Sequence, residues 1–393
     1  MNTTLVNARL VTPFRVQPEG WLRIQDGAIA EVGRKTVPGQ ARDGRVIDLN
    51  GAYVLPGFID LHLHGIGGIS YMDDVTPEQL NRAAELLLEH GVTGALITPI
   101  ARPEAELVAM LRSLREYLLS PAASKVYLGI HLEGPFLNRT MPGMMDPASF
   151  WDADLAAAQR LFDAGGDQIK LMTIAPELPG GLDIVREAVR RKIVPSIGHS
   201  AATYDEVVAA IDCGVVQVTH IFNAMKPAHH RDPGVLGASY THQELKVQLI
   251  ADGIHVHPVI MEFCAQVKGP QGVLLISDAI PPSGQADGVY AVRGRQVHIK
   301  NGSAQLADGT LAGSVCHLER GVANMVRLAN VSIKHAARMA GLNPARVLGL
   351  DHSRGVLATG HRADLVVLND RLEVVMTLLN GEVVFDRKGG PER

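Results

Sequence analysis

The chain has 393 residues, with 37 lysines and arginines against 41 aspartates and glutamates, so its net charge is −4 when histidine is counted as neutral. At 46% hydrophobic residues, the sequence is too apolar and too evenly charged for a disordered protein. The near-zero charge also excludes the basic stripe of a nucleic-acid-binding protein, so we expect no nucleic-acid partner. The count of 16 histidines against two tryptophans is unusual and raises the question of a metal site.

The cysteines and the start of the chain bear on cellular location. Cys213, Cys264 and Cys316 lie far apart and form no C-x-x-C pair, which is typical of a protein in a reducing cytosol. The first ten residues lack the basic and apolar stretches of a signal peptide, and no apolar run approaches the roughly 18–20 residues of a membrane span. We therefore expect a cytoplasmic protein that does not contact a membrane.

Short strands are predicted at both ends of the chain. Near the amino terminus they cover residues 4–11, 21–32 (bent at Asp26-Gly27) and 45–49. Near the carboxyl terminus they cover residues 364–368, 374–379 and 382–385, with Asn380-Gly381 between the last two. Asp-Gly and Asn-Gly between alternating apolar residues are hairpin signals. Because chain ends often lie close together, we predict one small β-sandwich domain formed by residues 1–53 and 350–393.

Apolar segments alternate with helical patterns through the middle of the chain. Eight such segments are predicted as strands, at residues 54–64, 94–99, 126–133, 168–175, 193–200, 215–223, 247–253 and 272–278. Helices are predicted over residues 77–90, where Thr76 and Pro77 are start signals, and over residues 103–119. The alternation predicts an α/β fold, a (β/α)8 TIM-type barrel over residues 54–349. An open doubly wound sheet is disfavoured because no G-x-G-x-x-G follows the first strand.

The region after the eighth strand carries further turn signals. Residues 289–314 contain turns at 300–302 and 307–309, and we expect a hairpin-bearing loop on the catalytic face of the barrel. Helices predicted over residues 317–328 and 331–340 then complete the barrel.

Five of the predicted barrel strands end in residue types that bind metals. The two-residue period of a strand places His62 and His64 on one face at the end of the first strand. The third, fifth, sixth and eighth strands end at or beside Glu133, His199, His220 and Asp278. Because the carboxyl ends of barrel strands converge, we expect these side chains to meet. Imidazole and carboxylate groups suit zinc or iron, and a coordination position left open for water would make the site hydrolytic.

The motifs around these residues resemble those of the amidohydrolase superfamily and, within it, the N-acetylglucosamine-6-phosphate deacetylases. They are PGFIDLHLHG (residues 56–65), HLEGPF (131–136), GHS (198–200) and THIFNAM (219–225). Further matches are HRDPG (230–234), ADGIH (251–255) and LAGS (311–314). The resemblance covers essentially the whole chain, including the two terminal β segments.

This resemblance implies one or two divalent metals per subunit, with zinc or iron expected first and manganese or cobalt as alternatives. It implies that Glu133, His199 and His220 bind the catalytic metal, and that His62 and His64 hold a second metal shared through Glu133. The alternative for the last two is a hydrogen-bonded pair without metal. Asp278 is implied as a metal-binding residue and as the acid/base carboxylate.

The implied reaction is hydrolysis of the N-acetyl amide of N-acetylglucosamine 6-phosphate to glucosamine 6-phosphate and acetate. By the same resemblance, Arg231 reaches the phosphate of a neighbouring subunit in a homodimer, assisted by Asn223 and the backbone of Ala224. His255 is a candidate donor to the oxyanion or to a sugar hydroxyl. The remaining residues expected at the substrate are Asp252, Met145, Leu311 and Gly313.

One departure from the family pattern and three alternatives stay open. Some relatives place a substrate-binding histidine in a Gly-x-His context where this chain has Gly143-Met144-Met145, and methionine cannot donate the same hydrogen bond. N-acetylgalactosamine 6-phosphate is therefore an alternative substrate. A dihydroorotase-like cyclic amidase is disfavoured, because Lys170 lies near the beginning of the fourth strand, away from the catalytic face. A non-catalytic homologue is the last alternative, although such proteins typically lose ligands that are all present here.

Overall fold

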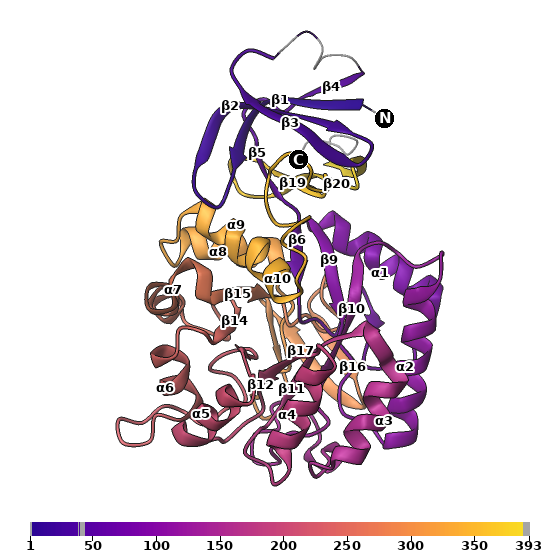
Figure 1. The fold of residues 1–393 in the computed structure, drawn as a ribbon, viewed down its shortest axis with the longest axis vertical. Coiled ribbons are helices and arrows are strands. Elements are labelled where there is room, and N and C mark those ends of the chain that lie inside the picture. Colours follow the sequence, from indigo (N-terminus) through magenta and orange to yellow (C-terminus); the bar gives the residue numbers. More distant parts are fainter. Residues whose placement is uncertain (1, 38, 40–43, 388–393) are drawn as a thin grey trace.

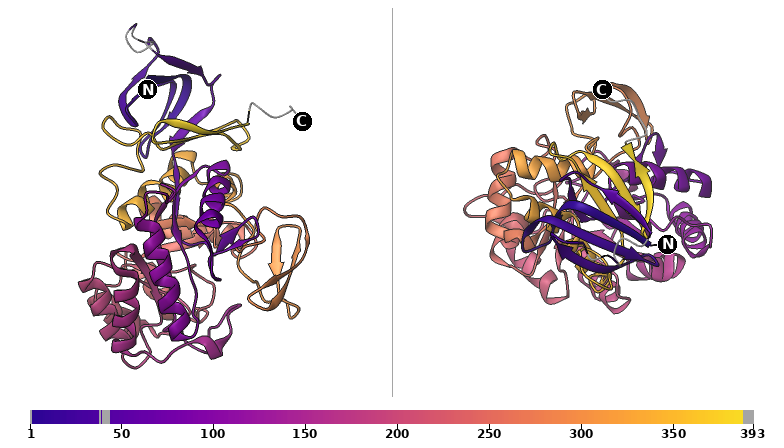
Figure 2. Two further views of the ribbon diagram at one scale, coloured as in Figure 1. Left: turned by 90° about the vertical axis from the view of Figure 1, so that its right-hand side faces the viewer. Right: turned by 90° about the horizontal axis from the view of Figure 1, so that it is seen from above.

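The computed structural model describes residues 2–37, 39 and 44–387. Figure 1 shows a barrel surrounded by helices and, at one end of it, a separate sheet made of the first and last strands of the chain. Both views in Figure 2 show the indigo strands from the start of the chain beside the yellow strands from its end in this terminal sheet, as the sequence predicts. Among the described residues, no helix is long and apolar enough to cross a membrane.

The terminal sheet joins the two ends of the chain in one mixed set of strands. Its members, in the order β21-β20-β19-β5-β1-β2-β3 with β4 paired to β1, are β1 (Asn2–Val11), β2 (Val16–Gln25), β3 (Ala28–Arg34), β4 (Arg45–Asp48), β5 (Tyr53–Pro56), β19 (Leu365–Leu368), β20 (Val374–Leu379) and β21 (Glu382–Asp386). Both predicted hairpins are confirmed. Asp26-Gly27 and Asn380-Gly381 all have positive φ, between 50° and 82°, as the favoured two-residue hairpin turns require.

One predicted strand was wrong in its extent. Residues 54–64 do not form a single barrel strand, because β5 pairs with β1 and β19 in the terminal sheet and only β6 (Phe58–Asp60) enters the barrel. The chain crosses between the two sheets at Gly57, where a Cβ atom would lie 2.1 Å from the Thr93 hydroxyl oxygen. The terminal sheet therefore extends to Pro56, past the boundary predicted after residue 53.

The barrel contains the eight predicted parallel strands, each hydrogen-bonded to the next. They are β6, β9 (Val92–Ile97), β10 (Tyr127–Glu133), β11 (Ile169–Ile174), β12 (Val194–Ile197), β13 (Gln217–Val218), β14 (Lys246–Ile250) and β15 (Val273–Ile276). The first and last strands close the barrel only at their carboxyl ends. There the Asp278 amide donates to the His62 carbonyl oxygen (2.9 Å) and the His64 amide to the Ala279 carbonyl oxygen (2.7 Å). The closing segments thus carry three of the predicted metal-binding residues, His62, His64 and Asp278.

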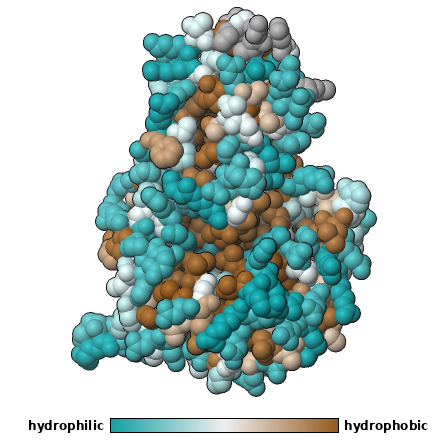
Figure 3. Space-filling model, in the orientation of Figure 1, coloured by the Kyte–Doolittle hydropathy of each residue, from teal (hydrophilic) through white to brown (hydrophobic). Residues whose placement is uncertain are grey.

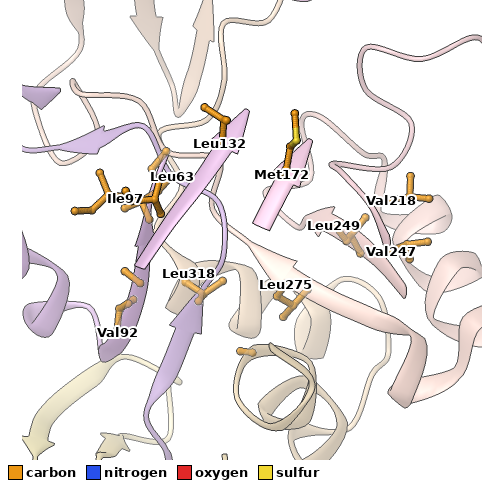
Figure 4. Packing of buried hydrophobic residues seen from close by; sticks show 14 of the residues in the cluster. Leu63, Val92, Ile97, Leu132, Met172, Val218, Val247, Leu249, Leu275 and Leu318 are labelled. Carbon is orange, nitrogen blue, oxygen red and sulfur yellow. The ribbon is translucent and has the colours of Figure 1, made fainter. Parts of the chain in front are cut away.

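Helices cover the outside of the barrel in the expected alternation. They are α1 (Pro77–Glu89), α2 (Glu104–Leu119), α3 (Leu155–Gly165), α4 (Gly181–Arg190), α5 (Tyr204–Asp212), α6 (Gly234–Thr241), α7 (Pro258–Gly272), α8 (Leu318–Arg327), α9 (Ile333–Ala340) and α10 (Leu342–Val347). Helix α1 begins as predicted, with Thr76 and Gln79 forming a capping box. Figure 4 shows the apolar packing between strands and helices, with Ile97, Leu132 and Leu249 on strands and Leu318 on α8. In Figure 3, hydrophobic residues gather over the middle of the barrel on this face, below the terminal sheet.

The predicted hairpin region forms a small sheet of its own beside the barrel. It consists of β16 (Gly288–Val292), β17 (Arg295–Lys300) and β18 (Ser303–Gln305), and it projects from the barrel in the left view of Figure 2. A shorter hairpin, β7 (Gly65–Ile66) and β8 (Ile69–Ser70), follows the His-x-His segment. The inner side chains of the small sheet pack against Met72, Ile100 and Met145. This contact places the insertion at the mouth of the barrel.

Candidate metal centre

The His-x-His segment lies just beyond the end of its strand. β6 ends at Asp60, and the chain continues in extended form, with Leu63 bridging Ala279 of the closing segment. The Asp60 carboxylate accepts hydrogen bonds from the backbone amides of His62 and Ser277, both at 3.2 Å, and burial raises the pKa of Asp60 to about 6. This carboxylate ties the first and last strands together below the two histidines.

Glu133, the last residue of β10, is the centre of the site. Its Oε1 lies 3.1 Å from His220 Nε2 and 3.3 Å from both His62 Nε2 and His199 Nε2. Its Oε2 lies 3.2 Å from His64 Nε2. Imidazoles from the first, fifth and sixth barrel strands therefore converge on one buried carboxylate, as the sequence analysis predicted.

Asp278 completes the cluster from the end of the eighth strand. Its Oδ1 lies 3.3 Å from His64 Nε2 and 3.5 Å from His62 Nε2. Burial by itself would raise the pKa of Asp278, but the two histidines outweigh it and lower the pKa to about 2. Asp278 is therefore a carboxylate at neutral pH, which is the form that accepts a proton.

The outer nitrogens of three of these histidines are all occupied by oxygen acceptors. His62 Nδ1 contacts Gln248 Oε1 (3.2 Å), His64 Nδ1 contacts the Thr98 carbonyl oxygen (3.0 Å), and His199 Nδ1 contacts the Met141 carbonyl oxygen (2.8 Å). Because these oxygens can only accept a hydrogen bond, Nδ1 carries the proton, and each neutral ring directs the lone pair of its Nε2 into the cluster.

These lone pairs and the two carboxylates give the site the chemistry of a cation-binding centre. His62 Nε2 and His64 Nε2 lie 3.2 Å apart, and two lone pairs at this distance repel unless a proton or a cation lies between them. Two groups of ligand atoms are close enough to hold an ion, His62–His64–Asp278 and His62–Glu133–His220. Imidazole and carboxylate ligands with ordered outer hydrogen bonds fit a divalent transition metal.

The backbone around the site is strained in a way that the rest of a barrel strand is not. His199, His220 and Asp278 have φ values of 49°, 26° and 49°, and Phe222 and Ala224 also have positive φ. A residue other than glycine in this conformation costs on the order of 1–3 kcal/mol and persists only where the surroundings impose it. Strain of this kind gathers at functional sites, which agrees with the position of the cluster.

A cavity of about 240 Å³ opens in front of the cluster. Of the residues predicted to contact substrate, the structure places six along its wall: Asn223, Ala224, His255, Met145, Leu311 and Gly313. Met72, Ile100, Met144 and Thr310 also line it, and the sequence analysis did not assign the first two or the last. Their residue types carry no chemical signal, so only the fold could locate them.

Two predicted substrate residues lie outside the wall of this cavity. Asp252 instead holds His255, accepting from its Nδ1 at 2.7 Å and from its backbone amide at 2.8 Å. Burial alone would lower the pKa of His255, but Asp252 outweighs it and raises the pKa. Arg231 is exposed, its Nη1 lies 2.7 Å from His230 Nε2, and it is not among the described residues that line the cavity. Its reach to a neighbouring subunit stays a prediction.

Gln248, in the middle of β14, is a functional residue that the sequence analysis missed. Besides contacting His62 Nδ1, its Oε1 accepts from the His220 backbone amide at 3.4 Å, so one side chain orients two members of the cluster. In the sequence it is only a polar residue in an apolar segment, and its full burial is seen only in the structure. His131 is also buried beside His62, but both of its ring nitrogens are bonded, to the Leu61 carbonyl oxygen (2.9 Å) and to Thr173 Oγ1 (2.8 Å). It is therefore not a ligand.

Comparison with known proteins agrees with this geometry. The amidohydrolase family matches residues 53–384 of the chain. The chain is 34% identical to N-acetylgalactosamine-6-phosphate deacetylase of Escherichia coli O157:H7, over 93% of this chain and 96% of that protein. It is 32% identical to N-acetylglucosamine-6-phosphate deacetylase of Bacillus subtilis (strain 168), over 96% of each chain.

Solved structures extend the comparison to the fold. A mutant N-acetyl-D-glucosamine-6-phosphate deacetylase from Mycobacterium smegmatis, in complex with N-acetyl-D-glucosamine-6-phosphate, superimposes with a TM-score of 0.90 at 34% identity, covering 98% of this chain and 99% of that one. Enamidase, at 17% identity and a TM-score of 0.64, shares the fold. From the family match and from relatives above 30% identity over nearly the whole length, the chain belongs to the amidohydrolase family.

Proposed function

We propose that this chain hydrolyses the N-acetyl amide of N-acetylglucosamine 6-phosphate, giving glucosamine 6-phosphate and acetate. The observation that carries the proposal is the convergence of four imidazole Nε2 atoms on Glu133, with Asp278 beside them at the floor of a cavity. The two relatives named above are deacetylases of N-acetyl hexosamine 6-phosphates, which supports this substrate class.

Glu133, His199 and His220 would hold the catalytic metal, since both imidazole Nε2 atoms lie within 3.3 Å of Glu133 Oε1. His62 and His64, which also contact Glu133, would hold a second metal that shares this carboxylate. The donor set suits zinc or iron, with manganese or cobalt as alternatives, at one or two ions per subunit. When bound, such a metal lowers the pKa of water to about 7 and polarises the amide carbonyl.

The proton transfers fall to Asp278. As a carboxylate it takes a proton from the attacking water while the new C–O bond forms, and it then gives that proton to the nitrogen as the C–N bond breaks. The products are a carboxylate and a free amine. His255 lies at the same cavity and is oriented by Asp252, which occupies its Nδ1–H. Its Nε2 can donate only when the ring is protonated, and its raised pKa favours that form. His255 is therefore the donor to the carbonyl oxygen or to a sugar hydroxyl.

The phosphate would be bound across a homodimer. Asn223 and Ala224 line the cavity of their own chain, whereas Arg231 lies exposed on the loop that follows them. An exposed guanidinium suits a phosphate brought by a partner subunit, since its planar fork matches phosphate oxygens. The proposed setting is the cytoplasm, because all three cysteines, each within the described residues, are unpaired.

N-acetylgalactosamine 6-phosphate is the second candidate substrate. It is favoured by the 34% identity to a deacetylase of that sugar and by the methionines at the loop position where some relatives carry a histidine. The cyclic-amidase alternative stays disfavoured, because Lys170 lies near the start of β11 and its Nζ donates to the Asp167 carbonyl oxygen at 2.6 Å. A non-catalytic role is disfavoured because all six polar residues of the cluster are present and close together.

The deciding experiment measures acetate release by metal-reconstituted protein. The substrates are N-acetylglucosamine 6-phosphate, its galacto epimer and unphosphorylated N-acetylglucosamine. We expect turnover of the gluco phosphosugar and at least about 100-fold less of the unphosphorylated sugar, since an ion pair to phosphate is lost. No turnover of either phosphosugar would overturn the proposal. Equal turnover of the unphosphorylated sugar would overturn the role of Arg231.

A further inference from the structure

One side of the substrate cavity is made of apolar side chains that take no part in metal binding or proton transfer. Met72, Ile100 and Met145 line the cavity and are only 1%, 6% and 6% exposed, and Met144 lines it beside them. These four residues, here called the methionine wall, belong to one apolar cluster that continues into the small sheet β16–β18. The wall presents no hydrogen-bond donor from a side chain.

The methionine wall begins directly beside the metal centre. Ile100 follows β9 and forms a backbone bridge with Glu133, and the Thr98 carbonyl oxygen two residues earlier binds His64. The polar side of the cavity comes from elsewhere. Asn223 and Ala224 follow β13, which is separated from β9 by three strands in one direction around the barrel. Ile100 and Asn223 therefore lie on opposite sides of the barrel, and the loop of Met144 and Met145 spans the mouth between them, since Gly143 lies close to Ala224.

The geometry of an amide assigns one part of the substrate to each wall. The scissile carbonyl must lie beside Asp278, which takes the proton of the attacking water, and a trans amide directs the substituent of its carbonyl carbon and the substituent of its nitrogen to opposite sides. The sugar phosphate is the polar substituent, so it lies toward Asn223 and His255. The acyl chain then lies against the methionine wall.

We propose that the methionine wall is the acyl-binding site, and that the enzyme hydrolyses N-acyl amino sugar phosphates whose unbranched acyl group is longer than acetyl. This inference rests on the proposed function. The reaction stays balanced: water supplies the oxygen of the released carboxylate and the proton of the released amine. Methionine has three rotatable bonds and a polarisable sulfur, so Met144 and Met145 can move to admit one or two more methylene groups. A hydroxyl on the acyl group would be left without a partner there.

The test compares four acyl derivatives of glucosamine 6-phosphate: N-acetyl, N-propionyl, N-butyryl and N-glycolyl. Propionyl and glycolyl are nearly isosteric and differ in polarity, so the ratio of their kcat/KM values measures the chemistry of the wall. We expect propionyl within about tenfold of acetyl, and glycolyl about 10- to 100-fold below propionyl. The proposal would be overturned if kcat/KM for the propionyl derivative were more than about 100-fold below that for the acetyl derivative. It would also be overturned if the glycolyl and propionyl derivatives had equal kcat/KM values. If none of the four is hydrolysed, the proposed function itself fails.

Matched variants test whether the methionine wall sets the ratio of kcat/KM for the glycolyl and propionyl derivatives. Met145→Gln keeps the length of the side chain and adds a donor, so it should raise the glycolyl-to-propionyl ratio about tenfold. If the first variant does not fold, Met144→Gln, at a half-buried position, should raise the same glycolyl-to-propionyl ratio. Leu119→Gln is the control, because Leu119 is an exposed residue of α2 that does not line this cavity, and it should leave the ratio unchanged. A ratio unchanged in both methionine variants would contradict the assignment.

Discussion

Residues with positive φ occur both in the terminal sheet and at the rim of the barrel, but they serve different purposes in the two regions. In the hairpins of the terminal sheet, positive φ falls on Asp26-Gly27 and Asn380-Gly381, residue types that adopt it at little cost. At the rim it falls on His199, His220 and Asp278, where it is costly. The first region is regular because local turn chemistry agrees with the fold. The second keeps a strained backbone because tertiary contacts hold its side chains at the cluster, which indicates that stability there is exchanged for chemistry.

The largest effect should come from the rim. Asp278→Asn removes the proton acceptor, so kcat should fall about 10²–10⁴-fold, while metal content measured by elemental analysis stays nearly unchanged. Asp212→Asn, on an exposed residue at the end of α5, is the control and should behave as the wild type. Loss of metal in the Asp278 variant would instead make this residue chiefly a ligand.

A smaller effect should follow from the residue behind the ligands. Gln248→Ala removes the acceptor that orients His62 and leaves the His220 amide without its partner, so metal affinity should weaken about 10- to 100-fold in a chelator competition assay. Gln243→Ala, on an exposed position before the same strand, is the control. Unchanged affinity in the Gln248 variant would show that the cluster is held by its strands alone.

The terminal sheet should respond in stability and not in activity. Gly381→Ala places a Cβ atom 2.8 Å from Ile24 Cγ2 at a φ of 82°, so the free energy of unfolding should fall by about 1–3 kcal/mol in denaturant titrations, with kcat unchanged. Gly51 has the same φ with open space around it, and Gly51→Ala should cost less. Equal losses in the two variants would show that backbone strain, and not the contact, sets the cost.

The subtlest effect concerns pH. Asp252 raises the pKa of His255, and the protonated ring is the form that donates from Nε2, so kcat/KM should fall as pH rises through this pKa. Asp252→Asn removes the charge that favours the imidazolium, so the alkaline limb of the pH profile should move to lower pH. An alkaline limb that does not move would mean that His255 acts in its neutral form or not at all.

Sequence reasoning succeeded where one residue type has one strong local meaning. Asn-Gly and Asp-Gly predicted the hairpins, and histidine or carboxylate at the end of an apolar strand predicted the members of the cluster. It failed at Gly57, because the change from the terminal sheet to the barrel depends on a close approach to Thr93 that no local pattern reveals.

Other parts of the site could not be predicted either, because they depend on contacts between residues that are distant along the chain. Gln248 acts through two partners that are distant along the chain, and Ile100 gains its position from a bridge to Glu133. The sequence gives no sign of the role of such side chains, because that role depends on their neighbours in the folded barrel. Most of the cavity wall was therefore predictable, and Met72, Ile100 and Thr310 were not.

The most direct measurement combines metal binding and catalysis on the same samples. Protein stripped by a chelator is titrated with Zn²⁺ or Fe²⁺, and bound metal and acetate release from N-acetylglucosamine 6-phosphate are measured at each step. Activity should rise with bound metal and saturate at one or two ions per chain, and Glu133→Ala should lose both, since Glu133 contacts every histidine of the cluster. Full turnover by the metal-free protein, or wild-type metal binding by Glu133→Ala, would contradict a Glu133-centred metal site.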